Sequence, residues 1–513
     1  MVEAYKSRDE LNHSRIFNVN RWSEYPEVNS FVNQIYDKHF SDLTKLRKHH
    51  LKVLLLDLYV CWYYDPDMCL AVHLNKNRYK KGSRYSALNI ATKTIDVVKT
   101  LLDDGFIYWA KGYRFEDTES KITRIWPTDK LIKLFKRASF DVLAIAPTPD
   151  TETIILRDAD KQNIEYEDTP TTIAMRKVIA DYNALLERTY IDVANLTKPF
   201  IERKQKKKKG RNRKTKIGIN QSNKRVHRVF NESFDRGGRF YGGFWSQIGS
   251  QHRRHIQLNG ERVIEQDFSG WHIQLLYARR NINYFEKFGN QSDPYDVHVP
   301  EINDPIYCRW LVKNLILVAV NAKTETSAIN AIQTMPTDED VTRPEGLVLS
   351  NKLLKSILHK LKALHSDIAE DFCSGAGIEL QNVDGEITNN LIKSFTEAQV
   401  PILTVHDSYI VPEKYHMDLW EEMQEQYKAL LLRGGHVDAD AIDSFDMGWA
   451  YTKVKQSGYY DEEMDTEEEG GGAKHLAILQ EKDEDLIETT AYQRRYSSWL
   501  ESDYLKWLTE KVT

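Results

Sequence analysis

Two aspartates, Asp267 and Asp407, stand beside apolar runs, where a carboxylate can do chemistry. Asp267 lies near the end of the run 262–268, and Asp407 lies in a polar His-Asp-Ser turn between apolar runs within 400–411. These patterns predict a strand and a β-hairpin. Carboxylates at the rim of a sheet suit a hard cation such as Mg²⁺. The alternatives are a helix cap at Asp267 and an ordinary turn at Asp407, although His-Asp-Ser is not a favoured tight-turn sequence.

A second pattern combines cations with an apolar helix. Arg309, Lys313, Leu317 and Asn321 are spaced four residues apart, which places them on one face of a helix predicted over 306–322. Two cations on one face can straddle a triphosphate, whereas the alternative is a solvated helix face. Most of the intervening residues are apolar, namely Leu311, Val312, Leu315, Ile316 and Val318. This helix is therefore expected to be mostly buried, so that its two cations call for a functional explanation.

A third pattern, Asp-x-x-Gly-Arg, runs from Asp235 to Arg239. Its glycines allow close approach of a ligand to the backbone, and its arginine suits phosphate. A tight turn with a surface arginine is the alternative.

In this order, the Asp-x-x-Gly-Arg pattern, the strand aspartate, the Arg-x₃-Lys helix and the His-Asp-Ser hairpin resemble a known polymerase superfamily. It holds the single-subunit phage-type and mitochondrial RNA polymerases and the family A DNA polymerases. The resemblance covers roughly residues 230–455. It implies that Asp267 and Asp407 hold two Mg²⁺ ions, which Mn²⁺ can replace, and that Arg309 and Lys313 bind the incoming triphosphate. Lys313 is also a candidate acid for the leaving pyrophosphate.

The resemblance extends to nucleic-acid contacts and to the fold. Asp235, Arg239 and His406 are expected to contact nucleic acid. The segment from Leu380 to Phe395 resembles the helix before the family's hairpin, where Gln381 is expected to touch primer or template. The implied fold is α+β, a right hand with palm, fingers and thumb.

The choice of sugar stays open. Asp235 and Ser408 favour the RNA polymerase branch, because DNA polymerases of this superfamily usually have threonine and glutamate there. His272 stands where DNA enzymes have glutamate and RNA enzymes have glycine, and Asn321 stands where both have tyrosine. We place His272 and Asn321 in the nucleotide site. A histidine there can donate to a 2′-hydroxyl or exclude it by size, and the alternative is a packed core histidine.

These patterns predict a template-directed nucleotidyltransferase, first of all a DNA-dependent RNA polymerase or primase. Its partners are a DNA template, nucleoside triphosphates and an RNA or DNA product. One alternative is a DNA polymerase of a phage or mobile element. An alternative from another class is a winged-helix DNA-binding replication initiator or regulator with an inactive palm. A template-independent transferase is a third.

The elements before this region predict a winged-helix-like domain over 46–140. Helices are expected over 51–64 and 84–102, then a hairpin from 106 to 126 and a short helix over 129–136. The other expected segments are an N-terminal arm (1–45), connector and thumb-like helices (141–200), a basic arm (201–225), palm and fingers (226–456), an acidic linker (457–483) and a C-terminal helix (484–513).

Charge is divided unevenly along a chain whose net charge is −5. Residues 201–225 hold twelve Lys/Arg and one acid, whereas residues 461–488 hold twelve acids and two lysines. This asymmetry favours a polyanionic partner for the basic run, which is expected to be a flexible arm, although a solvated linker would look similar. The residues assigned there to nucleic-acid binding are Lys206, Lys207, Lys208, Lys209, Arg211, Arg213 and Lys214.

Composition excludes several classes of protein. Hydrophobic residues make up 41% and charged residues 29%, which is typical of a globular chain and not of a disordered one. The sequence contains no stretch of about 18 apolar residues, so no membrane-spanning helix is expected. The expected location is the cytoplasm of a bacterial or phage-infected cell, and the oligomeric state stays open.

Overall fold

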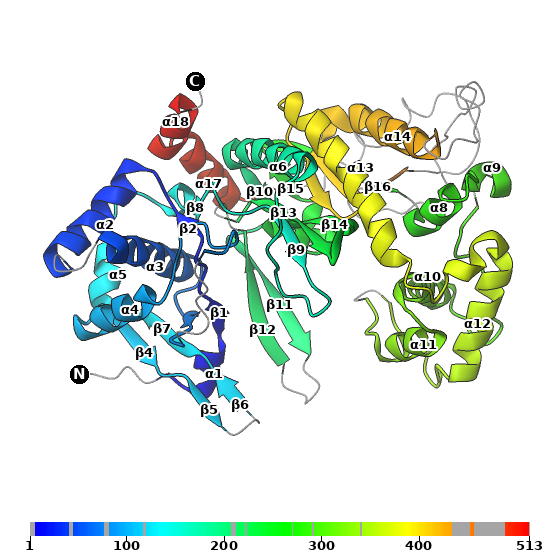
Figure 1. Ribbon diagram of the computed structural model, residues 1–513, viewed down its shortest axis with the longest axis horizontal. Helices are drawn as coiled ribbons and strands as arrows, with labels where there is room; N and C mark the ends of the chain where they lie inside the picture. The colour runs from blue at the N-terminus through cyan, green and yellow to red at the C-terminus, as the bar shows by residue number, and fades with distance from the viewer. Residues whose placement is uncertain are drawn as a thin grey trace.

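The computed structural model is α+β (Figure 1). Its buried apolar side chains form two cores. It describes residues 6–40, 45–75, 82–115, 119–206, 212–219, 221, 223–268, 270–289, 292–338, 341–432, 452–455 and 488–511. The acidic linker and Lys207, Lys208, Lys209 and Arg211 lie outside the described residues. Within these ranges, no helix has the length and apolar character needed to cross a bilayer.

The first core is built by the N-terminal part of the chain. Its helices are α2 (Pro26–His39), α3 (Lys45–Tyr64), α4 (Lys93–Asp103) and α5 (Asp129–Phe135), while the short α1 (Arg8–Asn12) has no buried residue. Its sheet has the order β1 (Ser14–Ile16), β3 (Cys69–Val72), β7 (Thr123–Pro127), β4 (Ile107–Ala110), while β5 (Tyr113–Phe115) pairs with β6 (Glu119–Lys121), and β2 (Arg21–Trp22) with β8 (Ala146–Pro147). The expected helix over 51–64, the hairpin and the short helix are therefore present. The winged-helix assignment itself stays a prediction.

Two expectations for this part were wrong. The N-terminal arm contains α2, whose Val28, Phe31, Val32 and Ile35 are buried in the core at helical spacing. The helix expected over 84–102 begins only at Lys93. The residues before it instead bind the segment that leads into α6, and the Arg84 guanidinium lies 3.3 Å from the Glu152 carboxylate.

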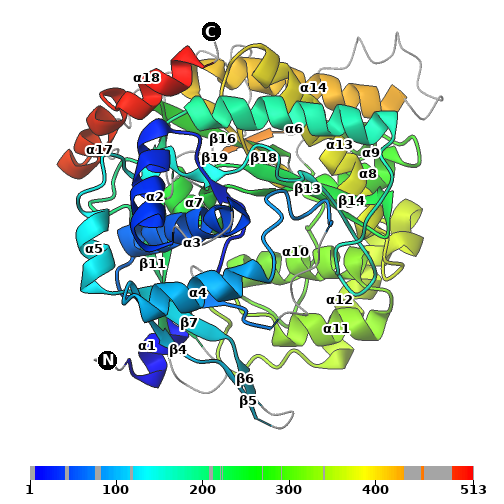
Figure 2. The same cartoon turned by 60° about the vertical axis from the view of Figure 1, so that its left-hand side comes forward.

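The second core contains two sheets. One has the order β10 (Ile191–Val193), β15 (Ile256–Leu258), β16 (Glu261–Phe268), β18 (Ser408–Pro412), β17 (Leu403–Val405), and β19 (Thr452–Lys455) also pairs with β16. The other has the order β14 (Ser233–Gly242), β13 (Val226–Asn231), β9 (Ile154–Arg157). The larger helices are α6 (Pro170–Arg188), α8 (Trp271–Ala278), α10 (Pro305–Asn321), α11 (Glu325–Thr334), α12 (Asn351–Leu364), α13 (Gly377–Glu397) and α14 (His416–Leu432). Figure 2 shows α10, α11 and α12 gathered at one corner of the molecule.

This core begins at Ile154, well before the expected palm boundary at 226. The segment 141–200 is therefore not a separate connector. Its helix α6 packs on α13 and β13, and the buried Tyr182 hydroxyl donates to the Ile402 carbonyl at 2.5 Å.

The basic run is a β-hairpin, not the flexible arm expected from its composition. Strands β11 (Phe200–Lys206) and β12 (Asn212–Gly218) pair antiparallel and project from the body of the molecule (Figure 1). Buried Ile201 and Ile219 anchor its base, and Lys216 Nζ lies 3.3 Å from Asp65 of the first core. Lys224 lies outside the β11–β12 hairpin, because it is buried and donates to the Thr189 carbonyl at 2.7 Å.

The C-terminal segment forms two helices, α17 (Thr490–Leu500) and α18 (Asp503–Glu510), where one docking helix was expected. The Ser502 hydroxyl accepts from the Leu505 N–H and starts the second helix. Tyr492 and Trp499 are buried in the first core. Arg495 bridges to the second core through Asp192 on β10, with Nε to Oδ2 at 2.8 Å. The last helices therefore join the two cores.

Candidate functional site

The two sequence-predicted carboxylates lie at the same end of neighbouring strands. Asp267 on β16 stands opposite Ser408 of β18 in the antiparallel register, and Asp407 immediately precedes Ser408. Asp407 occupies the two-residue turn of the predicted β17–β18 hairpin, which is confirmed. His406, the other turn residue, has φ 59°. The backbone thus brings together two aspartates that are far apart in the sequence.

Arg239 of the Asp-x-x-Gly-Arg pattern lies beside this pair. Its Nε donates to the buried Asp384 carboxylate on α13 at 2.5 Å. Burial lowers the pKa of Arg239, but the charges of Asp384 and Asp407 outweigh it and raise that pKa overall. The Nη2 atom of Arg239 is buried and makes no hydrogen bond within the described part of the chain. Arg239 is therefore held in place by one carboxylate and retains a donor for an anion.

Gly238 of this pattern allows helix α13 to approach the β14 backbone closely. A Cβ on Gly385 would lie 2.4 Å from the Gly238 carbonyl oxygen, so β14 and α13 touch backbone to backbone. Gly238 has φ 91° and lies where the β13–β14 register shifts, which a side chain would strain. The fully buried Arg228 donates to the same carbonyl at 2.7 Å and to Glu386 at 2.9 Å. Close packing of a helix, which was not among the expectations, explains Gly238, whereas a Cβ on Gly237 would meet Asn231 and Val229 of β13.

Asp384 is the site residue that sequence reasoning missed. It is 1% exposed and accepts from Trp271 Nε1 at 3.2 Å as well as from Arg239. Burial raises its pKa to about 6; Arg239 opposes this and the Asp407 charge adds to it. A signal existed, because Asp384 follows Gln381 by one helical turn and precedes Gly385.

We expect Asp384→Asn to change how stability depends on pH. The folded-state pKa of about 6 lies above the model-peptide value for aspartate, so the folded state binds the extra proton and this contribution to stability is lost as pH rises through 6. Measured by denaturant unfolding in EDTA between pH 4 and 7, the variant should gain on the order of 2 kcal/mol relative to wild type across that range. Asp160→Asn, at an exposed position, should run parallel to wild type; parallel curves for Asp384→Asn would contradict the assignment.

Two histidines complete the immediate surroundings of Asp407. Burial and the Arg239 charge lower the pKa of His272 to about 4, while Asp407 opposes this shift, so His272 is neutral at pH 7. His406 is exposed, and its ring lies 6.2 Å from that of Tyr241. Tyr241 is 40% exposed on β14, and its aromatic face is a further feature that the motifs did not identify.

The predicted basic helix is present as α10. Arg309, Lys313 and Asn321 are exposed, while the residues between them are mostly buried, as expected. Arg309 Nε lies 2.8 Å from Asp293 Oδ2. The charges of both Asp407 and Arg309 act on the buried Tyr295 phenol, whose pKa is raised chiefly by burial. Tyr295 thus connects the start of the basic helix with the hairpin carboxylate.

The remaining predicted residues are spread more widely. Asp235 is exposed and accepts a hydrogen bond from Ser233 two residues away. Gln381 is half-buried on α13, one turn from Asp384. Asn321 Nδ2 donates to the Leu317 carbonyl at 2.7 Å. Lys206 lies at the end of β11 and Arg213 and Lys214 lie on β12, all in the hairpin rather than beside Asp407.

The chain supplies two carboxylates for a cation. Among the described residues, no three His, Cys, Asp or Glu side chains converge as a metal cluster. The Asp267 Oδ1 atom is buried, while Asp407 lies at the turn. Since Mg²⁺ commonly keeps waters and shares one or two carboxylates with substrate phosphates, this pair fits an ion whose shell a triphosphate completes.

Comparison with known proteins adds no assignment: no protein-family model matches the chain, and no curated protein is significantly similar to it. The site combines two carboxylates, an arginine with a buried donor and an exposed basic helix face.

Proposed function

We propose that the protein is a template-directed nucleotidyltransferase, most specifically a DNA-dependent RNA polymerase or primase. One observation carries the proposal: the register of β16 and β18 brings Asp267 next to the Asp407 turn, with Arg239 and His272 beside it. In the right-hand fold proposed with it, the sheet that holds β16 and β18 is the palm, and α10, α11 and α12 are the fingers. The first core would be the winged-helix-like domain that brings DNA to the palm.

The proposed reaction joins a 3′-oxygen to the α-phosphorus of a nucleoside triphosphate. The bond from that phosphorus to pyrophosphate breaks, and the hydroxyl proton leaves to solvent. Asp267 and Asp407 would hold Mg²⁺, which when bound supplies charge neutralisation for the phosphates and activates the hydroxyl. Arg309 and Lys313 would bind the triphosphate, and Lys313 can protonate the leaving pyrophosphate.

His272 bears on which sugar is accepted. Because its imidazole is neutral at pH 7, it can both donate and accept a hydrogen bond without adding charge near the two carboxylates. A ribose 2′-hydroxyl is a partner of that kind. This favours ribonucleotides, while a DNA polymerase of a phage or mobile element remains the rival within the same class.

The decisive experiment supplies the full chain with Mg²⁺, primed or unprimed single-stranded DNA, and labelled rNTPs or dNTPs. Product from rNTPs without a primer is the expected result. Product from dNTPs on the primed template alone would instead establish a DNA polymerase. Labelled homopolymer without template would indicate a template-independent transferase. No product with Mg²⁺ or Mn²⁺ on single-stranded or duplex DNA would contradict the proposal and favour a DNA-binding initiator or regulator.

The β11–β12 hairpin is expected to supply phosphate contacts. Replacing Lys204, Lys206, Arg213 and Lys214 by Gln should weaken binding to a single-stranded oligonucleotide. Since each phosphate contact contributes about 0.7 to the slope of log affinity against log salt, the slope should fall by up to about 3. Fluorescence anisotropy at several salt concentrations measures this.

A matched control replaces four lysines that are ion-paired within their own helices, so the change in net charge is the same. These are Lys177, Lys393, Lys428 and Lys506. The control should keep the wild-type slope. An unchanged slope in the hairpin variant would show that the basic run is a spacer only.

A further inference from the structure

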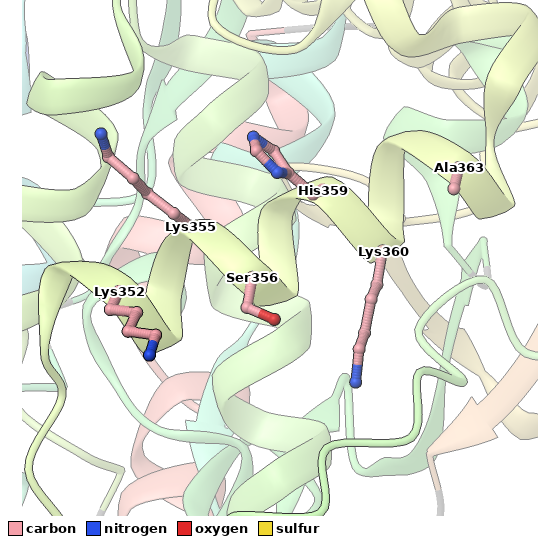
Figure 3. A pocket seen from close by; sticks show the side chains of 6 residues that line it. All are labelled: Lys352, Lys355, Ser356, His359, Lys360 and Ala363. Atoms are coloured by element: carbon pink, nitrogen blue, oxygen red, sulfur yellow. The ribbon is translucent and has the colours of Figure 1, made fainter.

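One face of α12 is basic along its length and open to solvent. Its exposed residues line an open depression on the surface and are Lys352, Lys355, Ser356, His359, Lys360 and Ala363 (Figure 3). The opposite face of the helix is apolar, with Leu354 and Leu358 fully buried in the second core. The amphipathic pattern fixes which side faces outward, so the basic face is presented by a rigid element.

The charge on this face is not balanced within the helix. The 14 residues of α12 include no acid, so its lysines lack the carboxylates that usually accompany them on a solvated helix. Lys352 even lies in the first turn, where the helix dipole disfavours a cation. Lys355 lies 3.8 Å from Glu325, and Lys360 donates to the His298 carbonyl at 2.8 Å. By contrast, Lys177 on α6 pairs with Asp181 on its own helix at 2.6 Å.

We propose that this face of α12 is a second nucleic-acid surface, which holds one strand through its phosphates. From Lys352 to Lys360 the helix rises about 12 Å. Each strand of a duplex carries one phosphate per roughly 3.4 Å along the duplex axis. A strand whose duplex axis runs along α12 would therefore present about three or four phosphates over that length. Lysine and serine side chains recognise phosphate without reading bases, so the surface binds without sequence preference.

The position of α12 relates this surface to the candidate active site. Helix α12 packs on α10, which carries Arg309 and Lys313. A strand bound to α12 would therefore lie on a helix that packs directly against the helix of Arg309 and Lys313, the residues proposed to bind the triphosphate. The choice of a nucleic acid as partner rests on the proposed function, but binding at this surface does not require catalysis.

Lysine footprinting on the intact protein tests this surface. The full chain is acetylated briefly with and without a primed DNA template, and each lysine is quantified by mass spectrometry. Lys352, Lys355 and Lys360 should react several-fold more slowly with DNA present, while Lys177, Lys393 and Lys506 keep their rates. Equal rates at the α12 lysines with and without DNA would overturn the proposal. So would equal protection by poly-L-glutamate at matched charge, which would indicate a general polyanion surface.

A second measurement separates this inference from the proposed function. Replacing Lys352, Lys355 and Lys360 by Gln should lower the salt slope for single-stranded DNA by about 2, and an unchanged slope would overturn the proposal. The same footprint on Asp407→Asn protein should be unchanged, because binding at α12 needs no catalysis. If wild-type protein shows the footprint but no nucleotide incorporation, only the proposed function fails.

Discussion

Asp407→Asn should abolish nucleotide incorporation while leaving the protein folded. The substitution removes one of the two carboxylates at the β16–β18 edge, and with it the charge that would hold a metal ion against a triphosphate. Loss of a preorganised charge at the reacting phosphate typically lowers the rate by about two to three orders of magnitude. Asparagine is well tolerated in two-residue hairpin turns, so the fold should survive.

The test measures single-nucleotide incorporation at saturating Mg²⁺, together with circular dichroism and the anisotropy of bound DNA. Asp267→Asn should show the same loss. The matched control is Asp160→Asn, because Asp160 is an exposed carboxylate in the turn after β9. Incorporation by Asp407→Asn within about tenfold of wild type would show that this carboxylate does not act as a metal ligand.

Of the substitutions proposed for this protein, Trp499→Ala should cause the largest loss in the free energy of unfolding. Trp499 is 2% exposed on α17, with its ring centroid 5.8 Å from that of Tyr190 and 5.0 Å from the Lys224 ammonium. Truncation would leave a cavity where the C-terminal helix meets the first core, and large-to-small changes at such sites cost about 3 to 5 kcal/mol. It would also remove the aromatic neighbour of the buried Lys224.

Denaturant unfolding followed by circular dichroism measures the loss. Leu500→Ala is the matched control, because Leu500 is the next residue and is 52% exposed, so its truncation should change stability by less than about 0.5 kcal/mol. Equal effects of the two substitutions would mean that α17 does not dock as the structure shows. If nucleotide incorporation also falls in Trp499→Ala at a temperature where the variant is folded, activity depends on the docking of α17 between the two cores.

Local sequence patterns predicted several elements well. The i, i+4, i+8, i+12 spacing of Arg309, Lys313, Leu317 and Asn321 predicted α10 with its exposed stripe, because side-chain periodicity is a local property of the helix. The apolar runs around His406 and Asp407 likewise predicted the β17–β18 hairpin. Composition was less informative. The lysine-rich run indicated a loop, yet its ladder of backbone hydrogen bonds and the apolar residues at its base make it the β11–β12 hairpin.

The sequence by itself determined the periodicity of α10 and the two aspartates that are candidate metal ligands. The α+β class followed from the resemblance that its motifs carry. Only the tertiary structure decided that Asp267 and Asp407 are neighbours, since antiparallel register joins residues without regard to their distance along the chain. It likewise showed that Asp384 is buried against Arg239 and that the C-terminal helices close onto the N-terminal core. Burial and long-range contacts depend on what packs against a residue, and one-dimensional patterns record only its neighbours in the chain.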